Sequence, residues 1–520
     1  MTGDSKSADV ENFHTEKVDY SYQQTASPNG ITQEDFDFLN NFPDEKRKKI
    51  LRKVDLRLMP MLTLLYLVAY IDKTNIGNAK IEGMTEDLHL RGLEYNIVVA
   101  IFFIPFILCA SVAEVPSNMI LYKFARPSIY IGSIVLAWGT IMTLTGIVQN
   151  YAGLLAIRFL LGIFEAGFLP GAILIISNWY LPNETQVRIA LLYTSAATGG
   201  AFSGLLAFAI ANMSGVAGLR GWRWIFIIEG IFTVAVAVMC FFLLCDTPAL
   251  SSGWLDAEEI RYLELRQISR RAQMPSEYKE SDGGHFNLKI FRDILFDCKI
   301  YLLTFASWSN AVPNYAMKFT MPSILTGMGY ANSAAQLMTI PPYAIGAVSA
   351  FGFAIFADRT SWRYPFLVGP QLCIITAFVI LFAMSGDIKD NVAVCYFAVC
   401  LACFGMYPVL PSVNAWNVAN TPDPAKRSVS IGLLVCTGNV GGLVGSYIYL
   451  DKEAPRYPTG YGTSLAFGGA GIIAATCLEL LLKRANRKKA AISEEEIHRA
   501  FTAEELRQMG EKSPLFMYAL

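Results

Sequence analysis

Long apolar stretches recur along almost the whole chain and are separated by short polar breaks. A helix of about 18 apolar residues or more is long enough to cross roughly 30 Å of hydrocarbon. The apolar runs predict twelve spans, near residues 58–78, 96–116, 128–148, 152–176, 190–211, 224–245, 300–326, 335–357, 366–385, 392–413, 429–450 and 463–482. The fold class predicted is therefore an all-α membrane protein with twelve transmembrane helices.

The longest polar interruption divides these spans into two halves of six. It covers residues 246–299 and carries eight Lys or Arg residues. Phe168-Leu169-Pro170 in the first half has a counterpart in Val409-Leu410-Pro411 in the second, which indicates an internal repeat of the kind found in transporters. The expected parts are an amino-terminal tail at 1–57, a six-helix bundle at 58–245, a central loop at 246–299, a second bundle at 300–482 and a tail at 483–520.

Basic residues predict the orientation of the chain. Seven Lys or Arg residues lie within 46–57 and five within 483–489, and the central loop carries the eight counted above. An even number of spans places these three segments on one side, which the positive-inside rule identifies as the cytosol. Residues 1–45 are polar, so no cleavable signal peptide is expected. A helix with mixed charge is expected at 255–271, and Ser493 resembles the start of a short helix in the tail.

Composition excludes several classes of function. The 520 residues are 53% hydrophobic and 16% charged, with a net charge of −1, which argues against a nucleic-acid surface. Most of the ten cysteines lie in apolar segments, where they are expected to pack as small hydrophobic residues. No metal-ligand, nucleophile or phosphate-loop pattern occurs, so neither an enzyme nor a cofactor or metal is expected.

Four charged residues within two predicted spans are the main candidates for chemistry. Asp72 and Lys73 lie in span one, and Arg158 and Glu165 lie in span four. At 1.5 Å per residue, Arg158 reaches about the same depth as Asp72 and Lys73, and Glu165 lies about 10 Å nearer the cytosol. Because a charge near the bilayer centre costs about 2.5–3.5 kcal/mol or more, the presence of these groups needs a functional or structural explanation. They can exchange protons and ligands, or they can form a structural ion-pair cluster.

Other embedded charges carry weaker expectations. Lys318 lies near the outer end of span seven, where it can either extend to the interface or attract an anion. Glu229 follows Trp222-Arg223-Trp224 and is expected to pair near an interface. Glu114 and Asp358 are expected at the cytosolic ends of spans two and eight, where contacts with gates or loops are favoured.

At these residues the chain resembles the major facilitator superfamily, and in particular the anion:cation symporter branch with its fungal allantoate, nicotinate and pantothenate permease-type group. The resemblance covers residues 45–485. It rests on Leu65-Tyr66, Asp72-Lys73-Thr74-Asn75-Ile76-Gly77-Asn78-Ala79, Glu114-Val115-Pro116-Ser117-Asn118, Arg158 through Pro170, and Gly221-Trp222-Arg223-Trp224-Ile225-Phe226-Ile227-Ile228-Glu229-Gly230.

The resemblance implies alternating access around a cavity lined by spans one, four, seven and ten. It implies proton coupling at Asp72 and Glu165, and it implies that Lys73 and Arg158 pair with these acids or with a substrate carboxylate. The sequence departs from the family where Lys73 replaces the more common Arg, and where the segment 114–126 lacks the usual G-x-x-x-D-R loop.

The carboxy-terminal half has no counterpart of the Arg158 and Glu165 pair, because the equivalent positions hold Val399 and Met406. This half is expected to supply shape and neutral hydrogen bonds to the substrate. The candidate side chains are Asn310, Tyr315, Tyr343, Tyr407, Asn414 and Asn439.

The function expected is secondary active transport, with proton-coupled uptake of a small organic anion such as nicotinate, pantothenate or allantoate. The alternative is a proton-antiport exporter of a metabolite or drug, which would share the fold and the carboxylates. The expected partners are the substrate, protons and the lipid bilayer. A monomer in the plasma membrane with both termini in the cytosol is expected, and the substrate itself is not identified by the sequence.

Overall fold

The computed structural model describes residues 33–123, 126–272, 288–360, 362–422, 424–502, 505–506 and 509–520. Over these residues each of the twelve predicted spans falls on a helix. In the first half these are α2 (Asp44–Ala79), α4 (Glu94–Lys123), α5 (Pro127–Thr145), α6 (Tyr151–Ala166) with α7 (Phe168–Trp179), α8 (Pro182–Ala211) and α9 (Gly221–Leu243). In the second half they are α13 (Cys298–Gly327), α14 (Asn332–Leu337) with α15 (Ile340–Thr360), α16 (Tyr364–Ala383), α17 (Val392–Asn420), α18 (Pro424–Gly445) and α19 (Pro458–Ala490).

The surface of these helices is apolar, as a lipid environment requires. Within the described chain, eight helical segments are long and apolar enough to cross a membrane by length and composition. Large hydrophobic side chains lie on the outside, among them Phe242 (82% exposed), Val348 (74%) and Phe351 (67%). A helix satisfies its own backbone hydrogen bonds, so this arrangement is stable in hydrocarbon.

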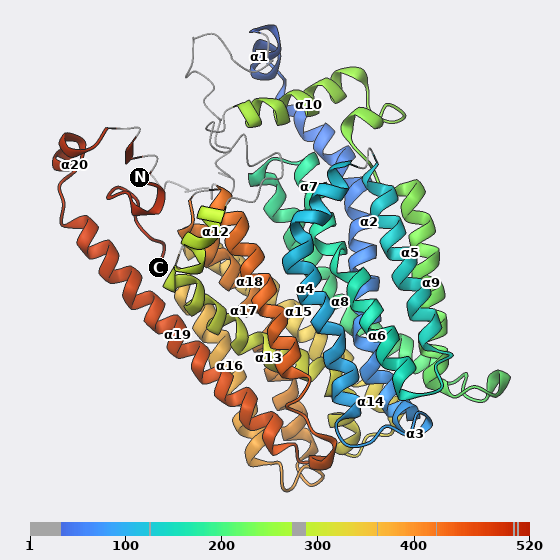
Figure 1. Cartoon of the computed structure of the whole chain (residues 1–520). Coiled ribbons are helices and arrows are strands. Elements are labelled where there is room, and N and C mark those ends of the chain that lie inside the picture. The colour runs from blue at the N-terminus through green and yellow to red at the C-terminus, as the bar shows by residue number, and fades with distance from the viewer. Residues whose placement is uncertain are drawn as a thin grey trace, which may run out of the picture.

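The helices form two packed halves, with the blue to green helices on the right and the yellow to red helices on the left (Figure 1). In the first half α5 packs against α9 and α4 against α6, and in the second α16 packs against α17 and α19. Each half has its own hydrophobic core. Trp138 and Phe168 lie in the first core, and Phe378 and Trp416 lie in the second.

Three pairs of long helices join the halves: α2 with α13, α8 with α15, and α4 with α18. The approach of α2 to α13 is close, because a Cβ atom on Gly77 would lie 2.8 Å from the carbonyl oxygen of Phe319. A larger residue at Gly77 would force the two backbones apart. Spans one and seven are therefore in direct backbone contact at the interface between the halves.

The remaining short helices identify the two ends of the bundle. α1 (Gln33–Asn40), α10 (Ala257–Ala272), α12 (Leu288–Leu295) and α20 (Glu494–Ala500) lie at the end that also carries the carboxy terminus, called here the terminal end. α3 (Thr85–Asp87) and α14 lie at the opposite end (Figure 1). The predicted helices of the central loop and the tail are confirmed by α10 and α20, and the Ser493 side chain caps α20.

Polar bridges join the two halves at the opposite end. Asn96 on α4 donates through Nδ2 to the backbone oxygen of Ser446, at 2.6 Å. Lys80, which follows α2, forms an ion pair with Asp451, which follows α18. These contacts join the two halves at the opposite end of the bundle.

Candidate functional site

Lys73 on α2 is held by a carboxylate and two aromatic rings. Its Nζ atom lies 2.9 Å from Oε1 of Glu165 on α6, and both side chains are buried. The same ammonium lies 4.4 Å from the ring centroid of Phe106 and 5.2 Å from that of Phe102, both on α4. Cation–π contacts of this kind add to the stability of a desolvated ammonium. The ion pair and the two rings together fix the position of Lys73.

Asp72 precedes Lys73 in the chain but has a different environment. It is 1% exposed, and its Oδ2 atom accepts hydrogen bonds from Trp138 Nε1 and Thr233 Oγ1, each at 2.9 Å. Successive residues on a helix point about 100° apart, so Asp72 faces α5 and α9 while Lys73 faces α4 and α6. The Oδ1 atom of Asp72 has no hydrogen-bond partner among the described residues.

Arg158 lies on α6 two turns before Glu165 and is only 3% exposed. Its guanidinium lies within electrostatic range of Glu165 and Asp72. Within the described part of the chain, Nε and Nη2 of Arg158 have no hydrogen-bond partner. A buried guanidinium with unused N–H groups is suited to binding a carboxylate, which can accept two parallel hydrogen bonds.

The local sequence explains why Glu165 lies at a helix end. α6 stops at Ala166, and α7 begins at Phe168. Pro170 has no backbone N–H and cannot donate to the carbonyl oxygen four residues earlier, which interrupts the helical ladder at this point. The interruption places Glu165 at the last turn of α6, beside Lys73.

The second half contributes Lys318, on α13, to the same region. Its Nζ atom lies 4.4 Å from the ring centroid of Tyr70 and 4.9 Å from that of Tyr315. No ion pair to Lys318 is found among the residues that the structure describes. Lys318 does not extend to the membrane interface, which was one of its two expected alternatives, because its ammonium packs on aromatic rings between the halves.

Of the neutral candidates, three tyrosines lie at the contact between the halves, and Asn439 contacts one of them. Tyr315 donates through its hydroxyl to Asn439 Oδ1, at 2.9 Å. The hydroxyl of Tyr407 lies 3.3 Å from that of Tyr70, so these groups bridge the second half to span one. The ring of Tyr343 lies against Gly200 on α8, where an added Cβ would be 2.8 Å away.

The other two candidates, Asn310 and Asn414, are not brought to these contacts by any hydrogen bond among the described residues. Each has an Oδ1 atom that is buried and has no partner in that part of the chain. Asn310 is 3% exposed and lies on α13, and Asn414 lies on α17. Both retain unused hydrogen-bonding capacity inside the second half.

Sequence reasoning missed several partners of the charged residues. Trp138 and Thr233 lie in apolar spans, and nothing in their own positions indicates that they bind Asp72. Glu229 was expected near an interface, and this is wrong because its side chain is buried on α9 and accepts a hydrogen bond from Asn75. The sequence signal that could have indicated a buried Glu229 is a carboxyl group within an apolar run. The side chains of Glu114 and Asp358 lie outside the described residues.

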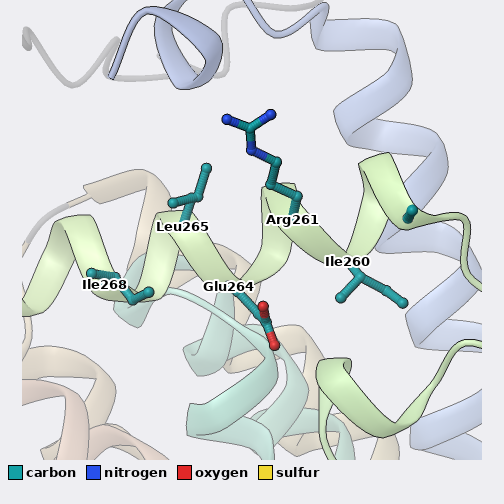
Figure 2. Close-up of a pocket in the computed structure, with 6 residues that line it drawn as sticks. Ile260, Arg261, Glu264, Leu265 and Ile268 are labelled. Carbon is teal, nitrogen blue, oxygen red and sulfur yellow. The ribbon is translucent and has the colours of Figure 1, made fainter. Parts of the chain in front are cut away.

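A surface pocket of about 300 Å³ lies on α10, at the terminal end (Figure 2). Arg261 and Leu265 point to one side of that helix and Glu264 to the other, and Arg261 forms an ion pair with Asp35 on α1, at 2.7 Å. The lining residues all belong to one helix: Ala257, Ile260, Arg261, Glu264, Leu265 and Ile268. None of them belongs to the Lys73–Glu165 region, so this pocket is separate from the candidate site.

Comparison with known proteins identifies the family. The family model described as Major Facilitator Superfamily matches residues 62–446. The chain belongs to the major facilitator superfamily. It is 37% identical over 489 residues to the MFS-type transporter cnsO of Penicillium expansum, with 92% of each chain covered. It is 30% identical over 474 residues to the high-affinity nicotinic acid transporter of Saccharomyces cerevisiae, covering 91% of this chain and 84% of that one.

Solved structures confirm the major facilitator fold. A bacterial homologue of the human lysosomal transporter Spinster gives a TM-score of 0.64 at 17% identity, covering 81% of this chain and 95% of that one. The D-xylose-proton symporter gives a TM-score of 0.58 at 16% identity, covering 80% and 96%. The protein is thus a multi-pass membrane transporter of the major facilitator superfamily, and it is not an enzyme.

Proposed function

We propose that this transporter couples the uptake of a small organic anion to the uptake of protons. The observation that carries the proposal is the buried ion pair between Lys73 and Glu165, with the unused N–H groups of Arg158 nearby. In this pair a carboxylate of the protein occupies a cationic site. A carboxylate on a substrate has the same chemistry and can take its place.

Protonation of Glu165 provides the coupling. A neutral carboxylic acid no longer balances the charge of Lys73, and leaving one partner of a buried ion pair without the other costs about 3–5 kcal/mol. An anion that then binds at Lys73 and Arg158 restores the balance. Proton binding and anion binding therefore favour each other, and this coupling is reciprocal by thermodynamic necessity.

The position of Glu165 beside Lys73 favours symport over antiport. In antiport, proton and substrate must compete for one group. An anion competes with the Glu165 carboxylate for Lys73, and protonation of Glu165 removes that competitor. The expected sign is an increase in anion affinity as the pH falls through the range in which Glu165 becomes protonated.

Aromatic residues support a substrate with a planar or apolar body. Phe102 and Phe106 flank Lys73, and Tyr70 and Tyr315 flank Lys318. A small heterocyclic or vitamin-like carboxylate of the nicotinate, pantothenate or allantoate type fits cations placed against rings. The relative named as a nicotinic acid transporter agrees with this class. We place the protein in the plasma membrane as a monomer, with the terminal end in the cytosol, the two helical bundles at 58–245 and 300–482, and protons entering from outside.

Uptake into proteoliposomes tests the proposal, with labelled nicotinate as the first probe and pantothenate and allantoate beside it. An inward proton gradient should drive accumulation, and addition of the transported anion should acidify the lumen. The control is the Glu86→Gln variant, which removes an exposed carboxylate on α3. Uptake that ignores the proton gradient contradicts the mechanism, and gradient-driven depletion of the substrate supports export by antiport.

A further inference from the structure

Glu229 is an intramembrane acid that the mechanism above does not use. It lies on α9 eight residues after Gly221, which is about 12 Å along the helix. Its side chain is 4% exposed, and Asn75 on α2 donates through Nδ2 to its Oε2 atom. Its Oε1 atom has no hydrogen-bond partner, and no cation pairs with it, among the described residues.

Glu229 and Asp72 are neighbours. Asn75, which donates a hydrogen bond to Glu229, lies one turn after Asp72 on α2. The carboxyl groups of Asp72 and Glu229 therefore lie on the same face of α2. Thr233 connects them further, because its Oγ1 atom is 2.9 Å from Asp72 Oδ2 and 2.9 Å from the backbone oxygen of Glu229. Each carboxyl group has one oxygen with hydrogen bonds and one without.

Among the described residues, the elements packed against α9 offer no cation that pairs with Glu229, and Arg158 on α6 is the cation within electrostatic range of Asp72. α5 carries Tyr130 near the terminal end, and α8 carries Glu184, Arg188 and Tyr193 toward the same end. On α2 and in the segment that follows it, Lys73 is paired with Glu165 and Lys80 with Asp451, and Glu82 lies beyond them at the opposite end. On α9 itself, Arg223 is paired with Asp87. Among the described residues, Asp72 is the charged group within electrostatic range of Glu229.

We propose that Glu229 is a second proton-binding site and that it forms a coupled pair with Asp72, which carries at most one negative charge. An ionised carboxylate buried in an apolar medium without a cation is costly, whereas the protonated acid needs only hydrogen bonds. Two neighbouring carboxyl groups cannot both ionise without strong repulsion, so their protons are taken up and released in linked steps.

A polar stripe connects this pair to the opposite end of the bundle. Asp72, Asn75, Asn78 and Glu82 follow one another at helical spacing, which places them on one side of the chain that starts with α2. Ser203 on α8 joins two of them, with its Oγ atom 3.2 Å from Asn75 Oδ1 and 3.0 Å from Asn78 Nδ2. The stripe runs inside the first half, so protons have a route to the pair that is distinct from the contact between the halves.

Glu82 stands at the outer end of the stripe and connects it to the second half. Its Oε1 atom accepts a hydrogen bond from Gln336 on α14, at 2.9 Å. This contact breaks when the two halves separate at the opposite end. Proton access to Glu229 is therefore tied to the same movement that opens the substrate site on that side.

The inference rests on the proposed function, since the protons held by the pair serve transport, but its first test is independent of transport. Infrared difference spectra of the purified protein between about pH 6 and about pH 10, a range in which exposed carboxyl groups are already ionised, report the carbonyl stretch of buried carboxyl groups that are still protonated. Glu229→Gln keeps the shape and should remove one such band, Glu229→Asp should retain a shifted band, and Glu86→Gln should leave the spectrum unchanged. A spectrum of Glu229→Gln identical to that of the unmodified protein would overturn the assignment.

The second test uses gradient-driven uptake of labelled nicotinate, with pantothenate and allantoate beside it. Glu229→Gln should reduce the accumulation ratio at least tenfold and retain counterflow, which also shows that the variant is folded. The Asp72→Asn/Glu229→Gln double variant should be no worse than the poorer single variant, because the two groups act as a unit. Losses that add would overturn the coupling. If the unmodified protein ignores a proton gradient, the proposed function fails, while the infrared result still decides whether Glu229 binds a proton.

Discussion

Replacing Glu165 with glutamine separates anion binding from proton coupling. The variant keeps the shape of the side chain and a hydrogen-bonding group but removes the carboxylate that lies 2.9 Å from Lys73 Nζ. Loss of one partner of a buried pair costs about 3–5 kcal/mol. Phe102 and Phe106 remain over the ammonium and offset about 1 kcal/mol of this cost.

The unpaired Lys73 ammonium therefore keeps a free-energy cost of about 2 kcal/mol or more, and binding of an anion removes this cost. At 1.4 kcal/mol per factor of ten, this corresponds to more than tenfold in affinity. At alkaline pH, Glu165→Gln should bind the transported carboxylate more than tenfold more tightly than the unmodified protein does. Its affinity should not depend on pH in the range where Glu165 titrates. Counterflow should persist, and accumulation driven by a proton gradient should be lost.

Calorimetric titration at several pH values measures the affinities, and counterflow and gradient-driven uptake in proteoliposomes measure the two modes of transport. Glu86→Gln serves as the matched control, since it makes the same chemical change at an exposed position of α3. If Glu165→Gln still concentrates substrate in response to a proton gradient, the proton site has been assigned wrongly. If it binds the anion more weakly at alkaline pH, the competition between Glu165 and substrate for Lys73 is refuted.

Three further variants test the surroundings of this pair. Arg158→Gln removes the unused guanidinium N–H groups and should abolish measurable uptake even at high substrate, while size-exclusion chromatography shows a folded protein. Lys318→Gln should raise the KM for a carboxylate at least tenfold with little change in the maximal rate of counterflow, because its ammonium faces the site without an ion pair among the described residues. Trp138→Phe removes one donor to Asp72 and should cost about 1 kcal/mol of stability, measured as a lower melting temperature in detergent.

The twelve spans could be predicted from the sequence because the bilayer imposes a length and an apolar composition on every crossing helix. The same rule located the unusual charges, since a carboxylate or ammonium within an apolar run is conspicuous. Short-range signals also sufficed for the capped helix at Ser493 and for the mixed-charge helix on the central loop.

The pairing of the charges could not be predicted in the same way. Sequence spacing gives the depth of a residue and its angle relative to others on one helix, but the rotation of a helix toward its neighbours depends on packing. Asp72 and Lys73 are adjacent in the chain, yet one faces Trp138 and the other faces Glu165. For this reason the position of Glu229 was misjudged and that of Lys318 was left open, because closeness to a helix end along the chain does not show what covers a side chain.

In the proposed mechanism, an anion and a proton bind together because the protonated Glu165 no longer forms an ion pair with Lys73. Calorimetric titration of the purified protein with nicotinate, or with the carboxylate that the uptake panel selects, tests this directly when it is repeated in buffers of different ionisation enthalpy. We expect uptake of about one proton for each anion bound near the midpoint of the pH dependence, and no proton uptake in Glu165→Gln. Anion binding that takes up no proton, or that releases one, would contradict it.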